Sequence, residues 1–324
     1  MRELILKTLK QERHISGQEL GKRLNISRTA IWKHINELRS RGYQIESSPK
    51  SGYTFIESTH LLLPEEIGLG LNTQVMGKHI VHYDEVSSTQ DMAAELARGG
   101  AAEGTLVIAE TPTKGRGRKG RSWVSPPEGG IYLSLILRPS LLPSRILQIP
   151  LIAGVALTKA IKETVPLEPL IKWPNDIVIA NKKVGGILTE MSSEIDGVNY
   201  VVLGIGINVN IPASLLAEQT AGIATSLAAE YGEYISRARL VRCFLSEFEA
   251  IYTEFLASGF SPVRGEWKAA NNTIGSWVKV TDGGEEIEGK ALDIDDDGFL
   301  LVRKESGHVS RIISGDVSLT NRVR

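Results

Sequence analysis

The chain has 324 residues and a formal net charge of −1, with 37 Lys and Arg against 38 Asp and Glu. With 42% hydrophobic and 23% charged residues, it is not a disordered tail, and its length predicts roughly two or three domains. The single cysteine, Cys243, excludes an intrachain disulfide and a multi-cysteine zinc site. Neither its start nor any apolar run resembles a secretory signal or a membrane span, so we expect a cytoplasmic protein.

The positive charge is concentrated at the N-terminal end. Residues 1–60 hold 11 Lys and Arg against 6 Asp and Glu, whereas the rest of the chain is acidic on balance. A basic segment on an acidic body suggests nucleic acid as a partner for that segment.

Two short helices joined by a tight turn are predicted from Gly17 to Asn36. Ser16 and Glu19 form a capping box, and Ser27 precedes a second apolar helix. The polar residues off the apolar stripe of that helix are Arg28, Thr29, Lys33 and Asn36. This is the plan of a helix-turn-helix, whose second helix enters the major groove of DNA. Arg28 and Thr29 are best placed for bases or phosphates, and Lys33 for a phosphate.

After Gly42 the apolar residues alternate, with a turn that carries Lys50 at its tip. This predicts a β-hairpin wing, so we expect residues 1–62 to form a winged helix-turn-helix DNA-binding domain. The alternative is a small helical cap with a solvated basic face.

The middle of the chain, residues 63–270, combines strands with fewer helices. Strands are predicted at 79–84, 105–110, 131–138, 170–173, 177–180, 184–191 and 200–208, and helices at 90–98, 145–164, 224–231 and 236–258. Several strands are joined by short hairpin turns, which favours an α+β domain with a mixed sheet over a doubly wound α/β fold.

Two polar stretches of this domain are candidates for anion binding. Ser87–Gln90 follows a strand and opens a helix, where hydroxyls cap the helix and free N–H groups bind polar ligands. A plain cap is the alternative.

The loop Lys114–Trp123 has five cations and three glycines in residues 114–121, and can wrap a phosphate or a carboxylate. Its glycines imitate dinucleotide-binding and P-loop patterns, but a strand follows instead of the helix that both require. An RGG-like nucleic-acid segment remains an alternative.

Two further stretches bring unusual residues into strands. Lys172 ends an apolar strand in the string Lys172-Trp173-Pro174-Asn175-Asp176, where its ammonium either meets an anion or extends to solvent. Glycines interrupt the strands at 184–190 and 204–210, which indicates either a ligand close to the backbone or tight bends.

Taken in order, Ser88-Thr89, Gly115-Arg116-Gly117-Arg118, Lys172–Asp176, Gly185–Leu188 and Gly206-Ile207-Asn208 resemble the motifs of biotin–protein ligases. With the helix-turn-helix in front, the whole chain is similar to the bacterial bifunctional biotin–protein ligases that also act as the biotin operon repressor.

The resemblance implies two reactions: biotin and ATP give biotinyl-5′-AMP and pyrophosphate, and biotin then passes to a lysine of a biotin carboxyl carrier protein, such as that of acetyl-CoA carboxylase. It implies Lys172 and Arg118 as catalytic residues. The implied biotin-binding residues are Ser88, Thr89, Gln90, Arg116, Gly117, Arg118, Lys172, Gly186, Ile187 and Leu188. The implied nucleotide-binding residues are Arg118, Arg121, Trp123, Asn175, Lys172 and Asn208. Pro112 stands where the family usually has glutamine, so that contact is not carried over.

The implied chemistry suits these residue types, because a carboxylate that attacks an α-phosphate must overcome repulsion between anions. Mg²⁺ would serve the phosphates of ATP, and we expect no site in which protein side chains alone hold a metal.

The acidic end, residues 271–324, alternates short strands with turns such as Asp282-Gly283-Gly284. Eight acids lie from Asp282 to Asp297. We expect a small β-barrel whose acids are mostly solvated, and the resemblance implies an SH3-like domain. It also implies a homodimer in the liganded state that binds palindromic operator DNA. Two alternatives stay open: a biotin-sensing repressor with little catalytic activity, and a lipoate-type ligase.

Overall fold

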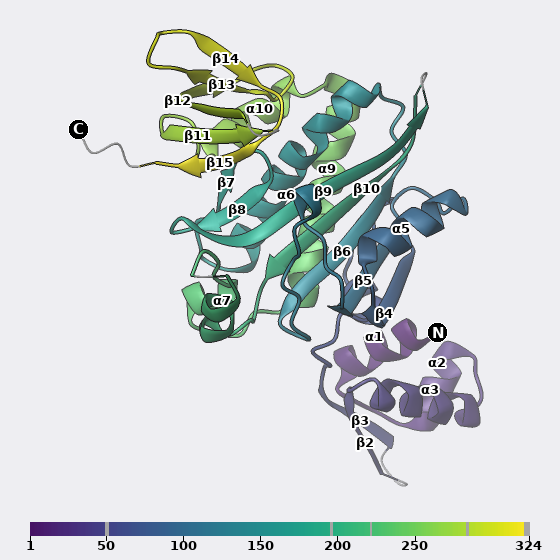
Figure 1. Cartoon of the computed structure of the whole chain (residues 1–324). Helices are drawn as coiled ribbons and strands as arrows, with labels where there is room; N and C mark the ends of the chain where they lie inside the picture. Colours follow the sequence, from purple (N-terminus) through teal and green to yellow (C-terminus); the bar gives the residue numbers. More distant parts are fainter. Residues whose placement is uncertain (49–51, 195–196, 221, 283–284, 321–324) are drawn as a thin grey trace.

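The computed structural model of the chain describes residues 1–48, 52–194, 197–220, 222–282 and 285–320. Its strands form three sheets of three, seven and five strands in chain order. The first and the third sheet lie at opposite ends of a central body that contains the second (Figure 1). The predicted α+β class is therefore confirmed.

The N-terminal unit is the predicted winged helix-turn-helix. It contains α1 (Arg2–Glu12), β1 (His14–Ile15), α2 (Gly17–Leu24), α3 (Arg28–Ser40), β2 (Gln44–Ser48) and β3 (Gly52–Glu57), with the sheet order β1-β3-β2. The hydroxyls of Ser16 and Ser27 accept hydrogen bonds from the backbone N–H groups of Glu19 and Ala30, at 3.0 and 3.1 Å. Both predicted caps are thus confirmed. The predicted wing tip at Lys50 lies outside the described residues.

The central sheet has the order β4-β5-β6-β10-β9-β8-β7, in which only the β4–β5 pair is parallel among the described strands. Its strands are β4 (Ile80–Val86), β5 (Leu106–Pro112), β6 (Gly130–Leu137), β7 (Leu170–Lys172), β8 (Asp176–Ile179), β9 (Lys182–Glu194) and β10 (Gly197–Asn208). Every strand predicted for this domain is present, within a few residues at its ends, and the predicted mixed sheet is confirmed.

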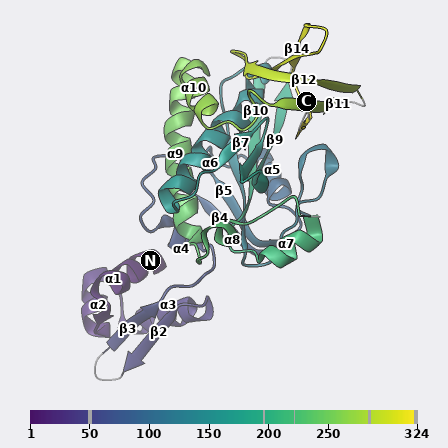
Figure 2. The same ribbon diagram turned by 90° about the vertical axis from the view of Figure 1, so that its left-hand side faces the viewer.

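Helices cover both faces of this sheet (Figure 2). They are α4 (Pro64–Gly68), α5 (Thr89–Arg98), α6 (Ile149–Thr164), α7 (Ala213–Thr220), α8 (Leu227–Tyr231), α9 (Arg237–Ser258) and α10 (Ser261–Ala269), with 3₁₀ turns η1 (Arg118–Gly120) and η2 (Pro143–Gln148). Along β5, Val107 packs with α5 and the neighbouring Ile108 packs with the core of α6 and α9, as alternation in a strand requires.

Some helix predictions were wrong in extent. The helix expected at 145–164 begins as η2 and becomes α-helical at Ile149, and the one expected at 224–231 begins at Leu227. α4, α7 and α10 were not predicted, because they have five to nine residues and bury only one to three of them, too few for a clear helical period.

The segment Pro143–Thr164 is long and apolar enough to cross a membrane by length and composition alone. In the structure, 72% of its most apolar window is buried inside the protein, and α6 packs against α9 and the sheet. It is the central core helix of the body.

The C-terminal sheet has the order β14-β13-β12-β11-β15 and is antiparallel throughout its described pairs. Its strands are β11 (Trp277–Asp282), β12 (Glu285–Ile294), β13 (Leu300–Arg303), β14 (Val309–Ile312) and β15 (Asp316–Leu319). The expectation that its acids are mostly solvated is confirmed, because six of the eight acids between Asp282 and Asp297 are exposed. Some of the eight also pair with cations: Arg264 lies 3.1 Å from Asp293, and Arg311 pairs with Asp295 and Asp297. The predicted turn at Gly283 and Gly284 lies outside the described residues.

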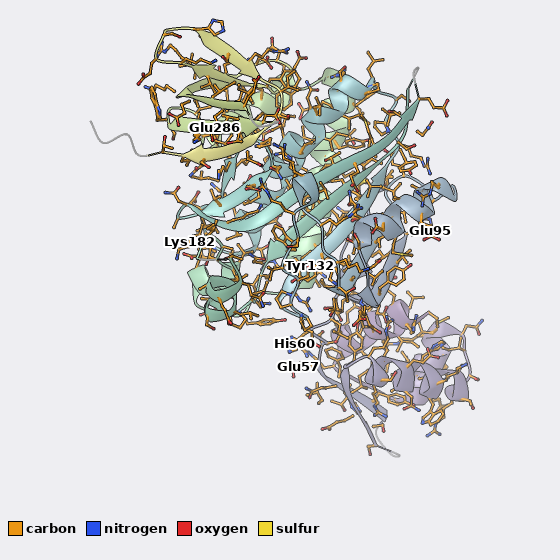
Figure 3. All side chains as sticks on the ribbon, in the orientation of Figure 1. Glu57, His60, Glu95, Tyr132, Lys182 and Glu286 are labelled. Carbon is orange, nitrogen blue, oxygen red and sulfur yellow. The ribbon has the colours of Figure 1, made fainter. Side chains whose placement is uncertain are left out.

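A buried ion pair of the body holds the segment that leads from the N-terminal unit. Arg237 of α9 lies 2.9 Å from the carboxylate of Glu110 on β5, and both side chains are buried. The same guanidinium donates hydrogen bonds to the carbonyl oxygens of His60 and Gly130, and the carboxylate accepts one from the N–H of Leu62. Figure 3 labels His60 at this junction. Residues 60–62 are therefore held by charges of the body, beside the domain boundary that we place at residue 62.

We expect Glu110→Gln to lower the free energy of unfolding by about 3 kcal/mol, because it leaves the Arg237 guanidinium buried without a counter-charge. Urea denaturation checks this. Glu286→Gln, which alters an exposed pair with Lys279, is the control and should leave stability almost unchanged. An equal stability of the Glu110→Gln and wild-type proteins would contradict the role given to this pair.

The pKa of Glu110 adds a pH dependence. Burial alone raises this pKa, but the neighbouring His82 ring and Arg237 charge outweigh burial and hold it below the ordinary value of 4.5. A carboxylate with a lowered pKa in the folded state stabilises the fold above its unfolded pKa, and the stabilisation is lost as the pH falls through the folded value. The difference in stability between wild type and Glu110→Gln should therefore shrink in acid.

Candidate active site

A cavity lies between the Lys114–Trp123 loop, called the arginine loop below, and the central sheet. Its walls come from the start of α5, the arginine loop, strands β6, β8, β9 and β10, and the first residue of β15. The predicted site residues that line it are Ser88, Thr89, Gln90, Arg116, Gly117, Arg118, Arg121, Trp123, Asn175, Gly186, Ile187 and Leu188. Residues that are far apart in the sequence are therefore brought to one cavity.

A buried polar group forms one wall of the cavity. The hydroxyl oxygen of Ser134 lies 2.9 Å from both Thr89 Oγ1 and Gln90 Oε1, and Gln90 Nε2 donates to the carbonyl oxygen of Val202. A Cβ at Gly204 would lie 2.4 Å from Gln90 Oε1. Glycine at this position in β10 thus makes room for the Gln90 amide, which is fixed in one orientation.

Ser88 occupies the N-cap position of α5, but its side chain makes no capping hydrogen bond. The expectation that this hydroxyl caps the helix was wrong. Ser88 is 3% exposed and lines the cavity instead.

Carboxylates from several elements face the cations of the arginine loop. Arg116 lies 2.7 Å from Asp91 of α5 and 3.1 Å from Glu190 of β9. At the other side of the loop, Lys119 lies 3.3 Å from Asp282, and both Lys119 and Arg121 pair with Asp316. Arg118 donates instead to the amide oxygen of Asn175 and to the carbonyl oxygen of Gly315, at 3.1 and 3.3 Å. The C-terminal sheet thus supplies two of the anions that hold the loop.

The ring of Trp123 lies against two glycines that are paired across β9 and β10. A Cβ atom added to Gly186 would lie 2.8 Å from the nearest atom of the Trp123 ring, and a Cβ atom added to Gly206 would lie 2.6 Å from it. We expected either a ligand close to these strands or tight bends, and the close neighbour in the structure is an indole ring. The glycine pair therefore allows Trp123 to form a flat aromatic wall of the cavity.

Lys183 is a cation of this site that the sequence analysis missed. It lines the cavity, its Nζ lies 5.2 Å from the centroid of the Trp123 ring, and it pairs with Asp176 at 2.6 Å. A signal was present in the sequence, because Lys183 is the second residue of the glycine-bearing strand β9, which forms a hairpin with the strand after Trp173-Pro174. Tyr132, Ser134, Asp176 and Asp316 are other lining residues that were not predicted.

Two predicted site residues do not line the cavity. Lys172 lies beside it: burial and the charge of Lys183 lower the pKa of its ammonium, while Asp176 and Asp316 raise this pKa in part. Asn208 is buried, and its amide donates to the carbonyl oxygen of Thr225 at 3.0 Å. Lys172 pairs with Asp176, and Asp176 pairs with Gly186, so Lys172 faces the same side of the sheet as these two lining residues. Asn208 has a contact that stabilises the end of β10.

The predicted DNA-contact residues form a separate surface. Arg28, Thr29 and Lys33 are exposed on α3, in the N-terminal unit at the far end of the molecule from the C-terminal sheet (Figure 1).

Three parts of the chain match known families. Residues 2–54 match the HTH domain family, residues 84–208 the biotin/lipoate A/B protein ligase family, and residues 273–320 the biotin protein ligase C-terminal domain. The chain is 43% identical to the bifunctional ligase/repressor BirA of Bacillus subtilis (strain 168), over 94% of both chains. The chain belongs to the bifunctional biotin–protein ligase/repressor family.

Further similarities extend over most of this ligase/repressor. It is 31% identical to the bifunctional ligase/repressor BirA of Escherichia coli (strain K12), over 94% of its own length and 92% of that protein. Its structure resembles that of a biotin protein ligase from Aquifex aeolicus in complex with biotin and ATP, with a TM-score of 0.64 and 32% identity. That match covers 75% of this chain and 99% of the Aquifex chain.

We expect Asp316→Asn to loosen the arginine loop of the ligase/repressor, because Lys119 and Arg121 lose their shared carboxylate. Tryptic cleavage within residues 114–121 of the ligand-free protein should become about fivefold faster, as an ion pair of about 1 kcal/mol implies. Asp297→Asn alters a carboxylate of the same sheet that faces Arg311, and this control should cleave like wild type. Equal cleavage of all three proteins would show that Asp316 does not hold the loop.

Proposed function

We propose that the chain is a biotin–protein ligase that forms biotinyl-5′-AMP from biotin and ATP, transfers biotin to a carrier protein and represses transcription of biotin genes. The observation that carries the ligase function is a cavity in which a fixed polar wall and the arginine loop face each other. Such a cavity suits a substrate with a polar ring at one end and a carboxylate at the other, next to a nucleotide phosphate.

The first reaction joins two anions. A carboxylate oxygen of biotin attacks the α-phosphorus of ATP, the bond from phosphorus to the bridging oxygen breaks, and pyrophosphate leaves. Cations fixed beside these groups offset their repulsion and stabilise the charge that develops on the phosphate oxygens. In the second reaction a lysine amine of the carrier attacks the acyl carbon, an amide forms, and AMP leaves with the bonding electron pair.

We assign the biotin ring to the wall formed by Ser88, Thr89 and Gln90, because these side chains are buried and present both donors and acceptors. Gly186, Ile187 and Leu188 would line the same pocket, and Arg116, Gly117 and Arg118 would cover it.

The nucleotide is assigned to the part of the cavity next to Trp123. Its ring offers a stacking surface for an adenine base, and Arg118, Arg121 and Asn175 lie around it on the cavity wall. We give Asn208 no direct contact with the nucleotide; it stabilises the end of β10.

Lys172 and Lys183 both fit a role at the α-phosphate. Lys183 lines the cavity, and Lys172 pairs across β7 and β8 with Asp176, which also lines it, so Lys172 faces the same side of the sheet. We therefore keep Lys172 and Arg118 as the catalytic residues and add Lys183 as a second cation for the reacting anions.

We propose that Mg²⁺ binds to the protein together with ATP, coordinated by the phosphates of the nucleotide. This ion is usually held by one or two carboxylates together with substrate phosphates. Asp176 and Asp316 are carboxylates on the cavity wall, and among the described residues no cluster of three or more His, Cys, Asp or Glu could hold a metal. The residues thus suit a metal that binds with its nucleotide and neutralises the leaving pyrophosphate.

The repressor function rests on the winged helix-turn-helix and on its exposed basic residues. In this proposal, biotinyl-5′-AMP favours a homodimer, whose two copies of α3 bind the two halves of a palindromic operator in the cytoplasm. Sedimentation of the protein with and without biotin and MgATP tests the dimer directly.

One assay separates the ligase from its alternatives. The protein is mixed with MgATP and either biotin or lipoate, and pyrophosphate release and label transfer to a biotin carboxyl carrier protein are measured. Release and transfer with biotin alone support the proposal. Lipoate as the better substrate would make the chain a lipoate-type ligase, and binding of biotin without turnover would make it a sensor.

Lys172→Ala should slow biotin-dependent ATP–pyrophosphate exchange about a hundredfold, as does the loss of one donor to a developing oxyanion. Lys183→Ala should also slow exchange, because it removes a second cation of the cavity. Circular dichroism and thermal unfolding establish that both variants are folded. Normal exchange by Lys172→Ala would contradict the catalytic role of Lys172.

Arg28→Ala should weaken operator binding about tenfold and leave biotin transfer unchanged, because this residue lies on α3 and outside the cavity. Gel-shift titration and the transfer assay measure the two activities. Arg303→Ala, which removes an exposed cation of the C-terminal sheet, is the matched control. Unchanged affinity of Arg28→Ala for the operator would argue against α3 as the recognition helix.

A further inference from the structure

Trp32 stands in the middle of the polar face of α3, and 59% of it is exposed. Residues four apart share a row on a helix, so Trp32 lies between Arg28 and Asn36, with Thr29 and Lys33 in the adjacent row. Among the described residues, no ring stacking or cation–π contact involves its indole. The helix therefore presents a large apolar surface where DNA contacts are expected.

The charge of the residues beside Trp32 indicates which partner binds over its indole ring. Two exposed cations of α3 flank it: Arg28 lies one turn before Trp32, and Lys33 lies in the adjacent row. A second copy of the same face would bring like charges together, whereas a DNA duplex brings phosphates to the cations and base edges to the ring.

Within a duplex, the position of Trp32 favours the bases over the backbone. The N-terminal residues of a recognition helix reach base edges in the major groove, and Trp32 is one turn inside the start of α3. The only methyl group on the base edges of that groove is that of thymine. An aromatic face gains by packing on a methyl group, whereas a phosphate offers it only charge and hydrogen-bond acceptors.

We propose that Trp32 is a specificity-determining residue that packs against a thymine methyl group in each half of the operator. This inference rests on the proposed repressor function and adds a base preference to it. Arg28 and Lys33 then supply charge, and Trp32 supplies selection for thymine at one position of each half-site.

The test starts from duplexes that the wild-type protein selects from a random-sequence library in the presence of biotin and MgATP. Each thymine in the selected site is replaced in turn by deoxyuridine, which removes only the methyl group. Affinities of wild type and Trp32→Ala are measured for every duplex over a range of salt concentrations. Leu4→Ala is the matched control, because Leu4 is 51% exposed on α1.

We expect Trp32→Ala to bind the selected duplex at least about tenfold more weakly, while Leu4→Ala binds as wild type does. One deoxyuridine per half-site should weaken wild type and should not weaken Trp32→Ala further. The dependence of affinity on salt should keep its slope in Trp32→Ala, whereas Lys33→Ala should reduce the slope by about one, as the loss of a phosphate contact does.

Two outcomes would overturn the inference while the repressor function stands: unchanged affinity of Trp32→Ala, or equal weakening of wild type and Trp32→Ala by every deoxyuridine. A weaker dimer of Trp32→Ala in sedimentation, at unchanged DNA affinity per dimer, would place the indole against a second copy and would also overturn it. Failure of the wild-type protein to select any duplex would instead reject the repressor function itself.

Discussion

Five cations lie within eight residues of the arginine loop, and three of them, Arg116, Arg118 and Arg121, line one cavity. Such a concentration of positive charge requires anions that face it, and this constraint organises the structure. Asp91 and Glu190 face one side of the arginine loop, and Asp282 and Asp316 face the other. The second pair belongs to the C-terminal sheet, which explains why a small acidic domain is docked at the mouth of the cavity. Without these carboxylates, repulsion among the cations of the loop would move the loop away from the site.

The same loop is connected to the DNA-binding unit through its two ends. β5 leads into the loop and carries Glu110, and Gly130 begins β6, where the chain returns to the sheet. Arg237 contacts both, and it also holds the carbonyl oxygen of His60 in the linker. A rearrangement of the loop therefore acts on residues that already fix the linker, so the fold offers a short physical route between ligand binding and the orientation of α3.

Sequence patterns that act over a few residues predicted most of the fold and many of the residues that line the cavity. The caps at Ser16 and Ser27, the alternation in the strands and the glycine spacing act over a few residues, and the structure has them as predicted. Long-range placement was not accessible in this way. Ser88 does not cap its helix, and Lys183 joins the cavity wall because β9 pairs with β8 and places Lys183 beside Asp176 and Trp123.

The carboxylates around the loop pair with cations that we assign to the substrates. Each is at least partly exposed, and such ion pairs contribute only about 0–1 kcal/mol each. A phosphate and a carboxylate that enter the cavity offer the same cations charged oxygens in a drier setting, where each contact is stronger. Arg116, Arg118 and Arg121 line the cavity, so charged oxygens that enter it would compete for Arg116 with Asp91 and Glu190, and for Arg121 with Asp316.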